Sequence, residues 1–223
     1  MDINEWILPS TYLVVLTIYP IVVRISNVKI ELIVPAVEEN APVPNLALPI
    51  LAALTPPDVD LSFTDDLLTP IDFGKDLKDV DLVGITVLTK TALRAYQIAD
   101  AYRKKGVCVV LGGIHPSALP EEAKEHADAV VIGEAEEIWG PLIEDFRAED
   151  LKPFYHQEGT IDPSKIPSPR REILPTRGYF PIDVVQATRG CPFHCEFCSV
   201  QKFFRSSYRF RPISDVVKEV KNV

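Results

Sequence analysis

The stretch ALRAYQIADAYRKKGVCVVLGG, residues 92–113, contains two different periodic patterns in succession. In residues 92–105 the apolar positions Ala95, Ile98, Ala99 and Tyr102 recur at intervals of three and four, which predicts a helix with one buried face. Gly106 is placed to end that helix. Residues 107–111 are continuously apolar, as expected of a strand buried on both faces of a parallel sheet. A helix followed at once by such a strand predicts an α/β fold.

The same alternation continues in both directions along the chain. Strand-like apolar runs occur at residues 29–34, 59–64, 82–86 and 129–132, and helix-like segments at 49–54, 120–126 and 134–147. Five strands with intervening helices predict a doubly wound parallel sheet of the flavodoxin-like, Rossmann type. Ligands of such sheets bind outside the carboxyl ends of the strands, so the loops at those ends are the candidate site.

These loops favour a bulky flat ligand over a dinucleotide. Residues 35–40, after the first strand, lack the G-x-G-x-x-G turn, which counts against NAD or FAD. Gly112 and Gly113 would let a flat ligand approach the backbone closely, and the hydroxyls of Thr86 and Thr89 could hydrogen-bond a nucleotide tail. An ordinary strand-end role explains Thr86 equally well, and a double glycine is also a common turn.

Other polar residues near the strand ends have structural explanations. We expect His115 to bond backbone within its loop, and Glu134 to satisfy the amino end of the helix 134–147. Asp65 and Asp66 follow the second strand and are expected at the surface, because no glycine loop accompanies them.

Three cysteines form the most specific motif of the chain. Cys191, Cys195 and Cys198 have the spacing C-x3-C-x2-C, so three thiols can turn inward on one short loop. A 4Fe–4S cluster usually takes four thiolates, and three would leave one iron open for another ligand. Zinc is the weaker alternative, with His194 as a fourth ligand. Cys108 lies in an apolar run and is expected to be a buried, inert thiol.

The cysteine motif closely resembles the signature of radical S-adenosylmethionine (SAM) enzymes. The resemblance implies that Cys191, Cys195 and Cys198 ligate a 4Fe–4S cluster and that the open iron chelates the methionyl amino and carboxylate groups of SAM. It also implies that Phe197 packs near the adenine of SAM, although a core role for this side chain is nearly as plausible.

The first domain resembles the cobalamin-binding domain fused ahead of many radical SAM barrels. The resemblance rests on Thr86-Val87-Leu88, on Gly112-Gly113 and on the stretch from Gly112 to Glu137. It implies that Thr86, Leu88, Gly112 and Gly113 contact cobalamin. The chain departs from the pattern of cobalamin-dependent methionine synthase because no histidine precedes His115. Any bound cobalamin is therefore expected to lack a protein histidine on cobalt.

Taken together, the resemblances imply the amino-terminal part of a cobalamin-binding radical SAM enzyme. Reductive cleavage of SAM would drive radical methylation or rearrangement of an unreactive carbon, with flavodoxin or ferredoxin as electron donor and a small-molecule or peptide substrate. Two alternatives remain: a radical SAM protein whose first domain is a relic without cobalamin, and a non-enzymatic iron–sulfur or zinc module. No residue beyond these ligands is predicted to be catalytic.

The predicted organisation has four parts. Residues 1–28 form an extension, residues 29–147 the cobalamin-binding-like domain, and residues 148–181 a proline-rich connector. Residues 182–223 are expected to begin a radical SAM (β/α) barrel, with a strand at 182–187 and a helix at 214–223. A barrel needs on the order of 200 residues, so we expect the chain to be a fragment.

Charge and hydropathy limit the location and the partners. The net charge of the 223 residues is −9, and residues 187–223 carry seven Lys/Arg against three Asp/Glu. The acidic remainder argues against binding to nucleic acid, whereas the basic end reads as a solvated face. Residues 6–23 are uncharged and long enough to span a membrane, but the acidic residues before them are not typical of a signal peptide. Clustered unpaired cysteines suit a reducing cytoplasm.

Overall fold

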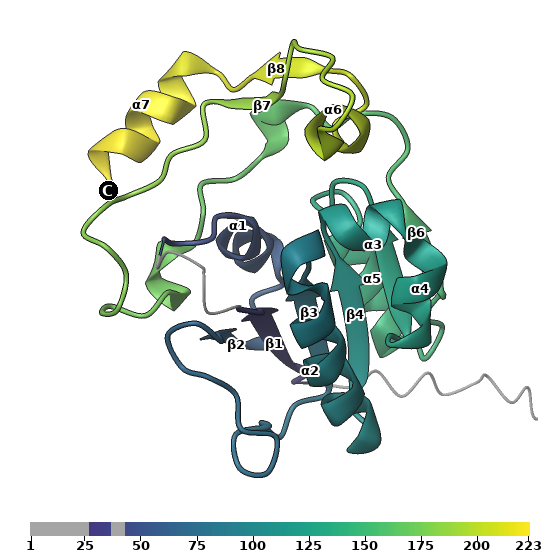
Figure 1. Cartoon of the computed structure of the whole chain (residues 1–223). Helices are drawn as coiled ribbons and strands as arrows, with labels where there is room; N and C mark the ends of the chain where they lie inside the picture. The colour runs from purple at the N-terminus through teal and green to yellow at the C-terminus, as the bar shows by residue number, and fades with distance from the viewer. Residues whose placement is uncertain (1–26, 37–42) are drawn as a thin grey trace, which may run out of the picture.

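A computed structural model describes residues 27–36 and 43–223 of the chain. Six parallel strands form one sheet in the order β2-β1-β3-β4-β5-β6, as Figure 1 shows for most of them. The strands are β1 (Lys29–Val34), β2 (Asp60–Asp65), β3 (Leu82–Thr86), β4 (Cys108–Gly112), β5 (Ala129–Ile132) and β6 (Phe154–His156). The flavodoxin-like fold is therefore confirmed, with one strand more than the sequence predicts.

Helices cover both faces of this sheet. They are α1 (Ala47–Leu54), α2 (Ala92–Lys104), α3 (Ile114–Ala118), α4 (Pro120–Glu125) and α5 (Trp139–Arg147), with short 3-10 turns at Thr89–Thr91, Pro163–Lys165 and Arg171–Ile173. Successive residues of a strand point to opposite faces, so each strand supplies both layers of the core. In β4, for example, Val109 and Leu111 pack with α2, whereas Val110 packs with α1 and α5.

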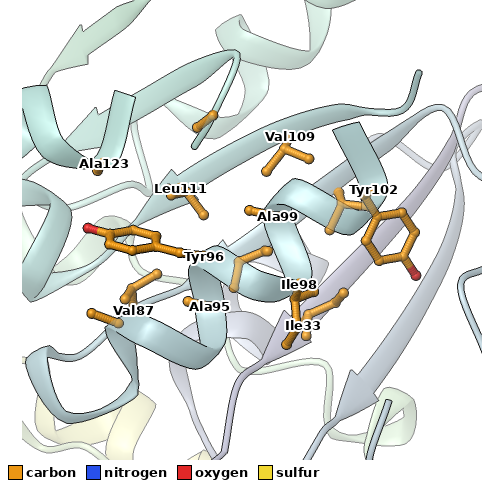
Figure 2. Close-up of a cluster of buried hydrophobic side chains, with 14 of the residues drawn as sticks. Ile33, Val87, Ala95, Tyr96, Ile98, Ala99, Tyr102, Val109, Leu111 and Ala123 are labelled. Atoms are coloured by element: carbon orange, nitrogen blue, oxygen red, sulfur yellow. The ribbon is translucent and has the colours of Figure 1, made fainter. Parts of the chain in front are cut away.

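The layer under α2 is one of two large apolar clusters, one on each face of the sheet. Figure 2 shows Ala95, Ile98, Ala99 and Tyr102 of α2 directed toward the strands, where they meet Ile33, Val109 and Leu111. These are the four helix positions that the sequence periodicity places on one buried face. The strands β1, β3 and β5 also begin and end at the predicted residues, whereas β2 and β4 are shifted by one residue.

The sixth strand comes from residues that the sequence assigns to the connector. In β6, Phe154, Tyr155 and His156 pair with Val130, Val131 and Ile132 of β5. The sheet therefore extends past α5, and the chain leaves it only after residue 156. Another difference is that α5 begins at Trp139 instead of residue 134, because residues 133–138 form a loop at the carboxyl edge of the sheet.

The part of the chain that follows β6, residues 157–223, lies over that carboxyl edge (Figure 1). It contains β7 (Thr188–Gly190), α6 (Ser199–Phe203), β8 (Tyr208–Phe210) and α7 (Ile213–Lys221). The predicted strand at 182–187 is wrong: in place of it, β7 pairs antiparallel with β8. Carbonyl oxygens of residues 182–187 are taken by arginine side chains, since Arg171 donates to Val184 and Arg211 to Gln186. The predicted helix at 214–223 is confirmed as α7, shifted by one to two residues.

No helix in the described ranges, 27–36 and 43–223, is long and apolar enough to cross a membrane. The uncharged stretch at residues 6–23 and most of the predicted extension 1–28 lie outside the described residues.

Candidate functional site

A cavity of about 180 Å³ opens at the carboxyl edge of the sheet, on the face covered by α1 and α5. The ends of β3, β4 and β5 form its floor, and four residues that follow β6 complete its wall. From residues before β6, the lining includes Leu48, Leu51, Gly84, Thr86, Gly112, Gly113, Gly133, Glu134 and Trp139; from residues after β6, it includes Gln186, Arg189, Phe203 and Phe204. The cavity is mostly apolar, with a few polar groups at its mouth, as small-molecule sites generally are.

Small residues keep the floor of this cavity open. A Cβ atom on Gly84 would lie 3.1 Å from Cδ2 of Leu32 and 3.2 Å from Cη2 of Trp139. The Trp139 ring is 2% exposed and is fixed by a hydrogen bond of 2.9 Å from its Nε1 to Oγ1 of Thr55. A Cβ on Gly112 would meet Cβ of Val131 at an ordinary 3.5 Å, so crowding does not exclude a side chain at this position of the cavity lining.

Gly113 is required by the backbone itself. Its φ of 104° and ψ of −169° fall in a region that is almost exclusive to glycine. A Cβ at this residue would lie 2.8 Å from the carbonyl oxygen of Val87. That oxygen already accepts the N–H of His115 at 3.1 Å, and the N–H of Val87 donates to Gly112 at 2.8 Å. The double glycine thus locks the end of β4 against the chain that follows β3.

The structure brings together three of the four residues predicted to contact cobalamin. Thr86, Gly112 and Gly113 all line the cavity. Leu88 is not among the lining residues, and its side chain is 44% exposed. Thr89 lies in the 3-10 turn before α2, where its hydroxyl is 3.3 Å from Nδ1 of His115.

His115 is held by side chains, which corrects the expectation of a backbone-bonded loop residue. It lies buried in α3, with Nε2 at 3.1 Å from the hydroxyl of Tyr96 and 3.2 Å from Oε1 of Glu122. Burial, together with the hydrogen bond to Glu122, raises the pKa of Tyr96. His115 therefore belongs to a polar cluster under α4 and does not line the cavity.

Asp65 and Asp66 are buried and not at the surface, so that expectation is also wrong. Asp66 accepts two hydrogen bonds from Arg94, at 2.8 and 2.7 Å, and others from the N–H groups of Ile71 and Ala36. Burial opposes ionisation, but these hydrogen bonds outweigh it and lower the pKa of Asp66. Because Ala36 lies two residues after the end of β1, Asp66 anchors the start of the first carboxyl-edge loop.

Glu134 does not cap α5, contrary to expectation. Its carboxylate is buried, and the residue before α5 is Ile138. Oε1 accepts from Nη1 of Arg189 at 3.0 Å, and Oε2 accepts from Nη2 of Arg209 at 2.8 Å. These partners lie 55 and 75 residues further along the chain, so no local pattern in the sequence could have revealed them.

The cysteine loop begins directly after β7 and ends at α6. All four cysteines lie in the described part of the chain and are free thiols, with Cys195 exposed and Cys191 and Cys198 half-buried. The N–H of Cys198 donates to the carbonyl of Cys195 at 3.1 Å, which gives the loop a turn between its last two thiols.

The donor chemistry of this loop fits an iron–sulfur cluster. Three thiols lie within eight residues, and His194 is engaged with the side-chain amide of Gln201. In this conformation, however, the described residues hold no group of three His, Cys, Asp or Glu side chains close enough to bind a metal. Phe197 is 93% exposed and packs in no core. Cys108 lies in β4, where burial raises its thiol pKa to about 12 and keeps it protonated.

Comparison with known proteins finds a family for the sheet domain. The B12 binding domain family matches residues 40–140. We therefore refer to this part of the chain as the B12-binding domain. The match contains the cavity floor, the double glycine and Glu134.

The similarity to curated proteins extends beyond the B12-binding domain. Bacteriochlorophyllide d C-8(2)-methyltransferase of Chlorobaculum tepidum is 40% identical over 179 residues, which are 75% of this chain and 38% of that protein. An uncharacterized methyltransferase of Pyrococcus horikoshii is 32% identical over 206 residues, covering 79% and 45%. The chain thus spans less than half the length of these relatives.

A solved structure shows the same fold. The radical SAM methyltransferase TsrM from Kitasatospora setae, with cobalamin and a 4Fe–4S cluster bound, superposes with a TM-score of 0.61 at 18% identity. The alignment covers 88% of this chain and 46% of TsrM, so it extends over the B12-binding domain and over much of the chain that follows β6.

Proposed function

We propose that this chain binds cobalamin at the carboxyl edge of its sheet and a 4Fe–4S cluster on the adjacent cysteine loop, as part of a radical SAM methyltransferase. The observation that carries the proposal is the junction of the two sites. The cavity of the B12-binding domain is closed by Arg189, Phe203 and Phe204, which flank Cys191, Cys195 and Cys198 on either side of the loop. A cobalamin in the cavity and a cluster on the loop would therefore be neighbours.

The residues of the cavity suit the nucleotide tail of cobalamin. Gly112 and Gly113 present bare backbone, Thr86 offers a hydroxyl, and Leu48, Leu51 and Trp139 supply an apolar wall. A flat aromatic base gains from such a wall because burying it removes apolar surface from water. No histidine occurs in the sequence before His115, and His115 is bonded to Tyr96 and Glu122, so we propose that cobalt receives no histidine from this chain.

The chemistry comes from the cofactors, while the chain holds and shields them. When bound, the cluster and SAM supply a radical and cobalamin supplies a methyl group for an unreactive carbon. A flavodoxin- or ferredoxin-type protein is the proposed electron donor, and the cytoplasm is the proposed location. Since relatives are named for methylating bacteriochlorophyllides, chlorophyll-type tetrapyrroles are the first substrate class to test.

Binding of hydroxocobalamin to the full chain tests the proposal directly. Titration calorimetry should show binding at micromolar cobalamin, and Gly112→Val should abolish it by filling the space in front of the backbone. Gly140→Val is the matched control, because a Cβ there has no atom within 4 Å and the residue is outside the cavity lining. A chain that takes up iron but no cobalamin would instead support a relic first domain within a radical SAM protein.

A further inference from the structure

A largely buried network of four charges joins the B12-binding domain to the β7–β8 hairpin, and the segment that connects the two strands contains the cysteine loop. Glu134 and Glu136 come from the loop between β5 and α5, and Arg189 and Arg209 come from β7 and β8. The Arg189 side chain is 6% exposed and that of Glu134 is 4% exposed. Burial alone would lower the pKa of Arg189, but hydrogen bonds and charge from Glu136 and then Glu134 outweigh it and raise the pKa.

The hairpin has an electrostatic problem of its own. Arg189 and Arg209 are direct partners across the β7–β8 ladder. Like charges directly opposite each other on paired strands are destabilising. Here both guanidinium groups reach the same carboxylate, one at each oxygen of Glu134. The repulsion within the hairpin is therefore neutralised by a residue of the other domain.

The other guanidinium nitrogens of the two arginines also have partners. Arg189 donates through Nε to Oε1 of Gln186 at 2.8 Å and also pairs with Glu136. Arg209 donates through Nε to Ser207 at 2.9 Å and through Nη1 to the carbonyl of Ile161 at 2.6 Å. Buried charges that are paired and fully hydrogen-bonded fix a geometry more sharply than exposed pairs do.

Gly190 transmits this geometry to the cysteine loop. It follows Arg189 and precedes Cys191, and its φ is +83°. A Cβ at Gly190 would fall 1.8 Å from the carbonyl oxygen of Ser207, so the two strands approach as closely as backbone allows. The first cysteine is thus held one residue beyond the contact between β7 and β8.

We propose that Glu134 is a positioning residue: it is the counter-ion that lets the β7–β8 hairpin close, and it thereby fixes the cysteine loop over the cavity of the B12-binding domain. Two arginines of the basic end, Arg189 and Arg209, then contact the B12-binding domain and do not belong to a solvated face. Glu134 acts through Arg189 and Arg209, and it need not touch the reacting groups.

Hydrogen exchange on the full chain without cofactors tests the first part of this proposal. Glu134→Gln should raise exchange of the β7 and β8 amides on the order of a hundredfold, because Arg209 loses its carboxylate partner and Glu136 alone is left to balance the two facing guanidinium groups. Amides of β3 should keep their protection, since the sheet does not depend on the network. Glu134→Asp keeps the charge and should restore most of the lost protection.

Arg209→Gln distinguishes neutralisation from simple packing. In the wild-type background it should increase exchange, since Glu134 loses a partner. In the Glu134→Gln background it should decrease exchange, because it removes one of the two repelling charges. Arg103→Gln is the matched control, since Arg103 pairs with Asp128 at the opposite edge of the sheet and should alter neither strand. An increase from Arg209→Gln in both backgrounds would overturn the proposal.

The second part, the placement of the cysteine loop, rests on the proposed function and needs a loaded protein. With cob(II)alamin bound and the cluster reduced, the cobalt electron paramagnetic resonance signal should be broadened by the nearby cluster in the wild-type chain and in Glu134→Asp. Broadening should be lost in Glu134→Gln at unchanged iron and cobalt content, and equal broadening in all three would refute the placement. If the wild-type chain binds no cobalamin, the proposed function fails, while the exchange experiment still decides the role of Glu134.

Discussion

Gly113→Ala should destabilise the protein even though it adds a single methyl group. The new residue would occupy a backbone conformation, φ 104° and ψ −169°, that costs a residue with a side chain about 1–3 kcal/mol. Its Cβ would also lie 2.8 Å from the carbonyl oxygen and 3.0 Å from the nitrogen of Val87, and such overpacking costs about 1–3 kcal/mol more. The expected loss is therefore about 2–6 kcal/mol of unfolding free energy.

Urea unfolding followed by circular dichroism measures this loss. With a slope of roughly 1–3 kcal/mol per molar urea, the midpoint should fall by at least about 0.7 M with little change in slope. Gly112→Ala is the internal control, because its Cβ meets Val131 at 3.5 Å and the residue needs no positive φ. Its midpoint should stay within about 0.5 M of wild type. A Gly113→Ala chain as stable as Gly112→Ala would refute the claim that Gly113 is fixed by its backbone contact with Val87.

Three further outcomes are expected. Changing Cys191, Cys195 or Cys198 to Ala should abolish iron uptake after anaerobic reconstitution, measured by iron analysis, whereas Cys108→Ala should take up iron normally because Cys108 lies in β4; full iron content in Cys195→Ala would contradict the assignment of the loop. Asp66→Asn should destabilise the protein at neutral pH, since the ionised form holds Arg94 and the N–H groups of Ile71 and Ala36. Because the pKa of Asp66 is lowered on folding, its contribution is present above the unfolded pKa of about 4 and disappears as pH falls through the folded value. The stability difference between wild type and Asp66→Asn should therefore shrink in acid, and a difference independent of pH would exclude this role. In the native protein at pH 8, a small alkylating reagent should modify the exposed Cys195 at least about tenfold faster than the half-buried Cys108, because the thiol pKa of Cys108 is raised to about 12; equal rates by mass spectrometry would count against the raised pKa of Cys108.

The parts of the fold that follow from local patterns could be predicted from the sequence. The strands β1, β3 and β5 are short, largely apolar runs with polar residues, glycine or proline close to both ends, and each is recognisable without knowledge of the strands that pair with it. The helix α2 is recognisable for the same reason, because four residues at helical spacing define its buried face. The cysteine loop and Gly112-Gly113 could be located because spacing alone limits what such residues can do.

Features that depend on distant partners could not be predicted in this way. The strand β6 is three residues long and is defined by pairing with β5, not by a pattern of its own. The segment 182–187 has the apolar content of a strand, yet its carbonyl groups bond to Arg171 and Arg211. Glu134 stands five residues before α5, where a helix-capping role is the simplest local reading, and its real partners come from β7 and β8.

The late position of β6 in the chain has a consequence for the nascent protein. During synthesis the amino-terminal domain folds first, and β5 remains the outer strand of the sheet until residues 154–156 have left the ribosome. Glu134 gains its second arginine partner later still, because Arg209 is synthesised 75 residues after it. The Glu134 carboxylate, which is buried in the complete fold, therefore remains in contact with water while the sheet is completed. The cysteine loop becomes fixed only in the last stage of folding. Any cofactor that enters the cavity has that interval in which the entrance is uncovered.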